Sequence, residues 1–408
     1  QTYAMQKRSY RPGSATLVTA AFIGPGTVTV CTLAGVEFGF ELLWALLISI
    51  LATIIIQNTA ARMSYQAELG LVSIVKEVIP NPFFKFISIA LILSAIFVGN
   101  IAYEAGNISG AVLGFEQYTT LPAVPMGDRL VKTTPIVICL IVALMIWKGQ
   151  LSLIKNMLIG VVGLMSVSFI LAAVATAPAM GDLLQGMFVP EMQEAALVRT
   201  LSLVGTTIVP YNLFLHAALV KDSKSKGVDL AYLQKDTYVS IALGGIISLC
   251  IVISAASLQG SYVQNAADMG QALIPILGDF APYLIGLGLF AAGLSSAITA
   301  PLAAAFVLGE SFSWDEKSDQ AKLKYTAIAV LLIGMIFASI GYKPIEIIQF
   351  AQVANGLLLP FIGIFMVGLL WSKNQLGITK PKIIEGFLLL TIMLFFFFLG
   401  MKSLGLIH

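Results

Sequence analysis

The stretches Ile23-Gly24-Pro25-Gly26-Thr27 and Ile208-Val209-Pro210-Tyr211-Asn212 each place a proline near the middle of a long apolar segment. Proline removes a backbone donor and clashes with the preceding helical turn, and glycine lets the backbone leave helical angles. A helix is therefore interrupted at both places. Free amides and carbonyls within a membrane must line a cavity or meet a ligand. We predict that the two breaks together form one binding site.

The composition around these breaks is that of a membrane protein. The 408 residues are 58% hydrophobic and only 11% charged, with a mean hydropathy of +0.93, whereas a soluble domain carries about 25% charged residues. Most segments between charge clusters reach the roughly 20 apolar residues that one bilayer crossing requires. We expect an all-α, multi-pass protein of the lipid bilayer, in a plasma membrane of bacterial type.

Eleven predicted spans divide the chain into two halves. With the N-terminus in the cytoplasm and the C-terminus outside, 18 of the 23 basic residues lie on the cytoplasmic side, as the positive-inside rule requires. The breaks fall in the first and sixth spans, so each half of the chain has five spans. Because five is odd, the second repeat (about 197–371) is inverted relative to the first (about 12–175). Inverted repeats with matching broken helices are typical of transporters with a site at the midplane. We predict one transporter domain over residues 1–408, with spans at 14–38, 40–61, 83–113, 133–147, 152–175, 197–220, 237–260, 280–309, 325–341, 344–371 and, as an extra helix, 383–401.

Other classes of function fit less well. The net charge of +2 and the absence of basic clusters interleaved with aromatic residues argue against nucleic acid as a partner. Cys31, Cys139 and Cys250 fall inside predicted spans without metal-ligand spacing, so they are interpreted as apolar filler. No catalytic motif such as His-Glu-x-x-His occurs, so no enzyme is expected. An ion channel stays open as an alternative, because broken helices also build filters.

The residues around both breaks resemble the Nramp family of divalent-metal transporters. Residues 35–44 read Gly-Val-Glu-Phe-Gly-Phe-Glu-Leu-Leu-Trp, and the family has Gly-x-x-Phe-Gly-Tyr-x-Leu-Leu-Trp there. Residues 209–216 read Val-Pro-Tyr-Asn-Leu-Phe-Leu-His against Met-Pro-His-Asn-Leu-Tyr-Leu-His, and Gln352 and Pro360 match the tenth span. The resemblance covers about residues 12–371. It implies a LeuT-type 5+5 inverted repeat that works by alternating access.

The same resemblance implies an altered ligand set. The family binds metal through an Asp, an Asn and a Met at the breaks, and these positions are Gly24, Thr27 and Val209 here. A carboxylate supplies charge, and a thioether helps to select transition metals. Without them we expect a small anion, such as bicarbonate, or a polar solute, with a divalent cation (Mg²⁺, or Mn²⁺ and Fe²⁺) as the alternative. The predicted substrate-binding residues are Gly24, Pro25, Gly26, Thr27, Thr29, Val209, Pro210, Tyr211, Asn212 and Gln352.

Hydroxyl groups in the eighth span suggest a coupling ion. Ser295, Ser296 and Thr299 have the spacing that LeuT-like carriers use to hold Na⁺. Small residues of this kind also let membrane helices pack closely, and this interpretation stays open. These hydroxyls suggest Na⁺ as the coupling ion, H⁺ or no coupling ion stays open, and no other cofactor is expected.

The third span carries the remaining coupling candidates. The family's Asp and Glu of this span fall on Asn100 and Tyr103, and Glu104 is displaced by one position. One position is about 100° around a helix, so Glu104 is not expected to replace the family's acid. Glu104, the one carboxylate well inside a predicted span, has either a functional role or a bond to Asn100 or Asn107.

Further polar residues are assigned two interpretations each. His216 has either a pH-linked or gating role or is a satisfied interior histidine. Gln349 and Asn355 either line the pathway or bond between helices, and Glu37 and Glu41 are expected at a solvated outer rim.

Overall fold

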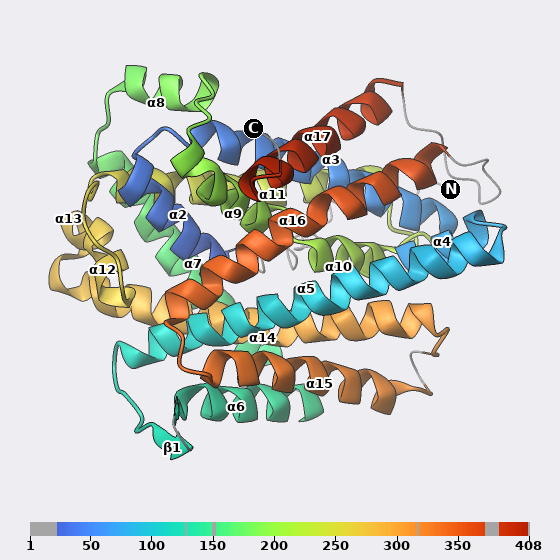
Figure 1. The fold of residues 1–408 in the computed structure, drawn as a ribbon, viewed down its shortest axis with the longest axis horizontal. Coiled ribbons are helices and arrows are strands. Elements are labelled where there is room, and N and C mark those ends of the chain that lie inside the picture. Colours follow the sequence, from blue (N-terminus) through green and yellow to red (C-terminus); the bar gives the residue numbers. More distant parts are fainter. Residues whose placement is uncertain (1–22, 127–128, 149–151, 316–317, 372–382, 407–408) are drawn as a thin grey trace, which may run out of the picture.

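The computed structural model describes residues 23–126, 129–148, 152–315, 318–371 and 383–406 as a bundle of helices (Figure 1). A two-stranded antiparallel hairpin, in which Val124 pairs with Val131, is a small exception to the all-α prediction. The elements in chain order are α2 (Pro25–Phe38), α3 (Leu43–Ala67), α4 (Leu71–Val78), α5 (Pro82–Glu116), β1 (Val124–Met126), β2 (Arg129–Val131), α6 (Thr134–Lys148), α7 (Ser152–Ala175), α8 (Met180–Phe188), α9 (Leu197–Thr207), α10 (Pro210–Val220), α11 (Leu230–Ala256), α12 (Ala266–Gly270), α13 (Ile274–Leu277), α14 (Ala281–Ser311), α15 (Gln320–Ser339), α16 (Pro344–Trp371) and α17 (Ile383–Ser403).

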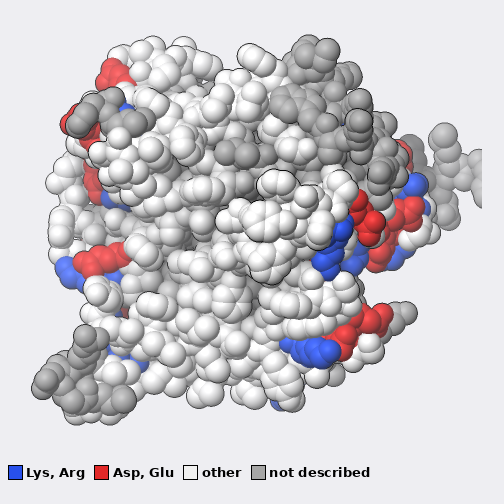
Figure 2. All heavy atoms as spheres, turned by 45° about the vertical axis from the view of Figure 1, so that its right-hand side comes forward, with Lys and Arg blue, Asp and Glu red and all other residues white. Residues whose placement is uncertain are grey.

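The helices confirm a multi-pass membrane protein. Nine helices in the described residues are long and apolar enough to cross a bilayer, and Thr134–Lys148 is a shorter apolar helix. Helix α2 corresponds to the second half of the first predicted span, whose earlier part, 14–22, lies outside the described residues. Charged side chains gather at two ends of the molecule, and a broad uncharged surface separates them (Figure 2). This distribution matches the apolar belt that lipid requires.

The start of helix α11 differs from the prediction, and this difference changes the number of buried carboxylates. Helix α11 begins at Leu230, seven residues before the predicted start at 237. The sequence prediction stopped at the pair Lys235 and Asp236, because charges usually mark the end of a span. The structure instead buries Asp236 completely within the helix. Glu104 is therefore not the only carboxylate inside a spanning helix.

Both predicted breaks are present as helix boundaries. Helix α2 starts at Pro25 with Gly24 as its N-cap, and α10 starts at Pro210 with Val209 as its N-cap. Proline is favoured at the first helical position, since its missing N–H has no intrahelical partner there in any case. Helix α9 ends at Thr207, so its C-terminus meets the N-terminus of α10 across two residues.

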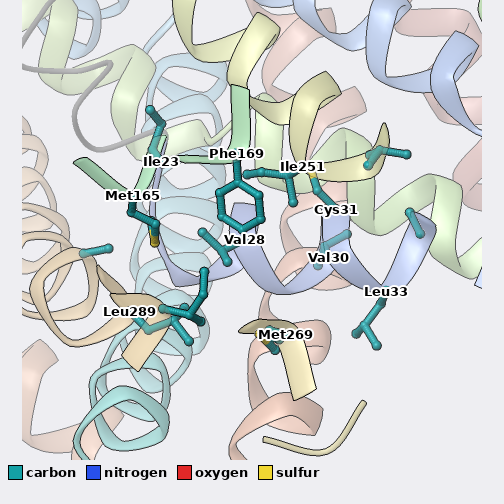
Figure 3. Close-up of a cluster of buried hydrophobic side chains, with 14 of the residues drawn as sticks. Ile23, Val28, Val30, Cys31, Leu33, Met165, Phe169, Ile251, Met269 and Leu289 are labelled. Carbon is teal, nitrogen blue, oxygen red and sulfur yellow. The ribbon is translucent and has the colours of Figure 1, made fainter. Parts of the chain in front are cut away.

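An apolar core holds α2 beside the breaks. Val28 and Cys31 of α2 pack with Phe169 of α7 and Ile251 of α11 in one cluster (Figure 3). In the close-up the Phe169 ring points toward Val28. The packing fixes one face of α2, so the polar residues of its first turns are held at the first break.

Candidate functional site

The two breaks meet through a pair of threonine hydroxyls. The Oγ1 atom of Thr27, at the start of α2, lies 3.1 Å from Oγ1 of Thr206, near the end of α9. Both side chains are buried. The structure therefore brings the first predicted break to the second, and the contact is made by a residue, Thr206, that the sequence analysis did not select.

Gln352 of α16 completes this polar centre. A β-carbon at Gly26 would overlap Nε2 of Gln352 and lie 3.2 Å from Oγ1 of Thr206. A β-carbon at Gly205 would overlap the carbonyl oxygen of Gln352. Glycine at 26 and 205 thus permits three helices to approach one point, as glycine commonly does where backbones must come close.

The second break supplies an amide and an aromatic ring. Asn212, in the first turn of α10, is fully buried, and its backbone N–H donates to the carbonyl of Val209 at 3.1 Å. The ring centroid of Tyr211 lies 5.1 Å from that of Tyr103 on α5, in an edge-to-face arrangement. Tyr103, Tyr211 and Val209 belong to a small apolar cluster of their own.

Several buried polar atoms of the site lack a partner among the described residues. Such atoms cost free energy unless water, an ion or a ligand meets them. Helix α9 also directs its last carbonyl groups toward the gap before α10, because the final carbonyls of a helix have no intrahelical donor. The site combines oxygen acceptors with amide donors and holds no charged side chain. The atoms are both amide atoms of Asn212, Oε1 of Gln352 and Oγ1 of Thr29.

The third-span residues point in two directions. Nδ2 of Asn100 donates to the carbonyl of Ala300 on α14 at 3.3 Å, and Tyr103 contacts the second break. Glu104 is completely buried, packs against Gly334 of α15, and accepts from Nδ2 of Asn107 at 3.3 Å. Adjacent residues of α5 therefore face different helices, as the helical period predicts. Glu104 faces α15.

The Thr299 hydroxyl, in the Ser295, Ser296 and Thr299 group of α14, bonds to carbonyl oxygens of its own helix. Oγ1 of Thr299 lies 3.2 Å from the carbonyl oxygen of Ser295 and 3.3 Å from that of Ser296. A β-carbon at Gly293, just before this run, would overlap Ala111 of α5. Both observations fit the helix-packing interpretation. The sodium site stays a prediction.

A cavity of about 300 Å³ opens at the end of the bundle where α2 finishes, which the sequence predicts to be the outer end. It reaches down to Leu33 and to Gln349, one turn from Gln352. Arg199 binds Glu37 at its rim through two hydrogen bonds, of 3.0 and 2.7 Å. Glu37 is therefore an ion-pair partner rather than a simply solvated residue. Glu41 accepts from Gln193 at 3.1 Å beyond this rim.

A second cavity, of about 340 Å³, opens at the opposite end and is lined by Ala218 and Phe306. The residues of the polar centre line neither of these two cavities, and all of them are buried: Thr27, Thr206, Asn212 and Gln352. The polar centre is therefore closed off from both openings in this structure.

Two further predicted residues are buried near this closed centre. His216 is completely buried on α10, and neither of its ring nitrogens bonds to a described residue. Asn355, one turn after Gln352, is buried, and its Oδ1 lies on the side of Gly99 of α5. Asn355 thus lies between α16 and α5, but its Nδ2 bonds to no described residue, so both interpretations of Asn355 stay predictions.

The comparison with protein families gives one match across the chain. The sequence model described as natural resistance-associated macrophage protein-like (Nramp) matches residues 15–405. Two curated relatives, both named divalent metal cation transporter MntH, come from Mesorhizobium japonicum and Bradyrhizobium diazoefficiens. They are 24% and 25% identical to this chain, over 90% of it and 82% of each relative.

Solved structures share the fold. A manganese transporter of Eremococcus coleocola superposes with a TM-score of 0.71 at 18% identity, over 99% of this chain and 89% of that one. Mhp1, a nucleobase-cation-symport-1 family transporter, superposes with a TM-score of 0.58 at 12% identity, over 98% of this chain and 93% of its own. The predicted broken-helix, inverted-repeat fold is confirmed by these neighbours.

Proposed function

Because this chain belongs to the Nramp family of membrane transporters, we propose that it carries a divalent metal cation by alternating access through the site at its two breaks. The curated relatives that it resembles are named as divalent metal cation transporters. The sequence alone favoured a small anion and kept the divalent cation as the alternative. The relatives favour the divalent cation instead.

One observation carries the proposal at the level of the site. Oδ1 of Asn212 and Oε1 of Gln352 are buried acceptors, and no described residue donates to them. They lie at the breaks together with the hydroxyls of Thr27 and Thr206 and the end of α9. Amide, hydroxyl and carbonyl oxygens are the neutral ligands that hard divalent cations accept. The negative end of the α9 dipole favours a cation at the same point.

The ligand types favour a hard ion. Mg²⁺ and Mn²⁺ accept oxygen ligands, whereas a soft ion such as Cd²⁺ gains most from sulfur. Val209 supplies no sulfur at the second break, and Gly24 supplies no carboxylate at the first. The affinity for a divalent cation falls as charged ligands are lost. We therefore propose a low-affinity carrier whose ion keeps part of its water shell, which Mg²⁺ does readily.

A small anion is the second candidate, and a specific observation favours it. Helices α2 and α10 both begin at the site, so two positive helix ends face it. Nδ2 of Asn212 is a buried donor without a described acceptor. An oxyanion such as bicarbonate would satisfy such donors.

Uptake into proteoliposomes separates the two candidates. We expect Mg²⁺ and Mn²⁺ to enter at millimolar concentrations, Cd²⁺ to enter no faster, and an inside-negative potential to accelerate entry. An anion carrier would be slowed by the same potential, since the sign of the moving charge is reversed. Bicarbonate-dependent thermal stabilisation, without any response to Mg²⁺ or Mn²⁺, would overturn the cation proposal.

The same assay tests coupling. Since Thr299 bonds within its own helix, uptake should not change when K⁺ replaces Na⁺ on both sides of the membrane. Counterflow with unlabelled ion inside should accelerate entry, because a carrier exchanges substrate and a channel does not. A several-fold requirement for Na⁺ would instead assign Ser295, Ser296 and Thr299 to a sodium site.

Thr206→Val tests the hydroxyl pair. Valine keeps the shape of threonine and removes only the hydroxyl, whose loss should weaken binding by about 1 kcal/mol, or roughly three- to tenfold in KM. The maximal rate should change little. Thr200→Val, at a buried position on the same helix, is the matched control and should leave KM unaltered. An unchanged KM in Thr206→Val would remove this residue from the site.

A further inference from the structure

A membrane-facing groove between α5, α15 and α16 lies apart from the transport site. Its volume is about 640 Å³, within the range of pockets that hold drug-sized ligands. Val98 of α5, Phe337 of α15 and Phe350 of α16 line it, and 62%, 53% and 68% of these side chains are exposed. All three belong to spanning helices. In Figure 1, α5 runs between α16 and α15 where α16 begins.

The groove is apolar along its length and polar at one end. Glu346, in the first turn of α16, lines this groove and also the outer cavity. Tyr342 lies beside it and is 63% exposed. Lys343, between the two along the chain, lines the outer cavity. No ion pair joins Glu346 to a described residue. A ligand here would have an apolar body and a head that offers a cation to Glu346.

We propose that this groove binds an acyl chain of a phospholipid with a primary-amine head group, from the leaflet at the start of α16. The bilayer supplies acyl chains to any apolar surface at this depth, so the body of the ligand follows from the location. The head group follows from charge. Glu346 receives the ammonium group, and the Tyr342 hydroxyl beside it donates to the phosphate.

The groove lies on the helix that carries Gln352, so a bound lipid is linked to the transport site. This link rests on the proposed function. Glu346 and Gln352 are six residues apart on α16, about 9 Å along the helix axis. A lipid that fills the space beside Ile347 and Phe350 holds α16 against α5 and α15. The same helix presents Gln352 to the breaks. A lipid bound in the groove therefore contacts the helix that carries Gln352.

Tryptophan quenching by brominated lipid tests binding without any transport measurement. Phe350→Trp places a reporter in the groove, and Phe387→Trp places one on α17, whose Phe387 is 66% exposed. Emission is corrected by subtraction of the parent protein. With brominated phosphatidylethanolamine diluted into phosphatidylcholine, we expect half-maximal quenching at 350 to need about fivefold less brominated lipid than at 387.

Three results decide the proposal. Glu346→Gln in the Phe350→Trp background should remove the advantage of the amine head group, and Ala102→Phe should remove preferential quenching by filling the groove. Brominated phosphatidylcholine should quench both reporters equally. Quenching at 350 that follows bulk mole fraction for both lipids would overturn the site, and a preference that persists in Glu346→Gln would overturn the pairing. These outcomes are independent of which ion the protein carries.

Discussion

Gly24→Asp should strengthen Mn²⁺ binding at least tenfold, or about 1.4 kcal/mol. Two unit charges 4 Å apart interact by about 4 kcal/mol near a protein surface, and a divalent ion doubles this. Desolvation of the carboxylate offsets most of the gain. The backbone accepts the change, since Gly24 is an N-cap with φ −89° and ψ 177°, which is extended backbone that any residue adopts. Aspartate is also a preferred N-cap residue.

The sign of the effect separates the two candidate substrates. Gly24→Asn has nearly the same shape and no charge, so it should change Mn²⁺ affinity by less than threefold. Isothermal titration and uptake should be measured for both variants. If the protein carries an anion, Gly24→Asp abolishes anion uptake and Gly24→Asn does not. Equal behaviour of the Asp and Asn variants toward Mn²⁺ would place the ion away from the first break.

The breaks could be predicted from sequence because their cause is local. Pro25 and Pro210 each begin a helix in the structure. The directions of Tyr103 and Glu104 also follow from the helical period alone. The start of α11 could not be predicted, because Asp236 is buried by tertiary packing while its charge suggests a span end.

The partners across the site depend on packing that no local pattern encodes. Thr206 meets Thr27 where Gly26 lets α2 approach α9 and α16. The neighbouring hydroxyls of Thr206 and Thr207, directly before the second break, were the available signal. The transported ion stayed open for a different reason. Neutral oxygens can bind a cation, and amide N–H groups can bind an anion. The proposed identity of the substrate therefore rests on family membership rather than on a diagnostic side chain.

The Tyr103 and Tyr211 rings close the site toward the cavity at the end of α10. Their cluster includes Ala303 of α14, with Leu215 of α10 packed against it. One turn further along the same helices, Phe306 and Ala218 line the cavity of about 340 Å³. The buried His216 follows Leu215 on α10, next to this apolar layer. We propose that the layer is the gate toward this cavity and that its two rings must separate before an ion leaves.

Removal of both rings should open this gate. Truncation of a buried aromatic side chain to alanine typically costs about 3–5 kcal/mol. Here that cost falls on the closed arrangement, so the population of the open arrangement rises.

The accessibility of a cysteine at position 206 measures this opening, in a background with Cys31, Cys139 and Cys250 replaced by alanine and with Thr206→Cys added. We expect a membrane-impermeant thiol reagent, applied from the side where α10 ends, to modify it at least tenfold faster in Tyr103→Ala/Tyr211→Ala. Tyr103→Phe/Tyr211→Phe keeps both rings and should react at the parent rate. Equal rates in all three proteins, each shown by thermal unfolding to be folded, would mean that the barrier lies elsewhere.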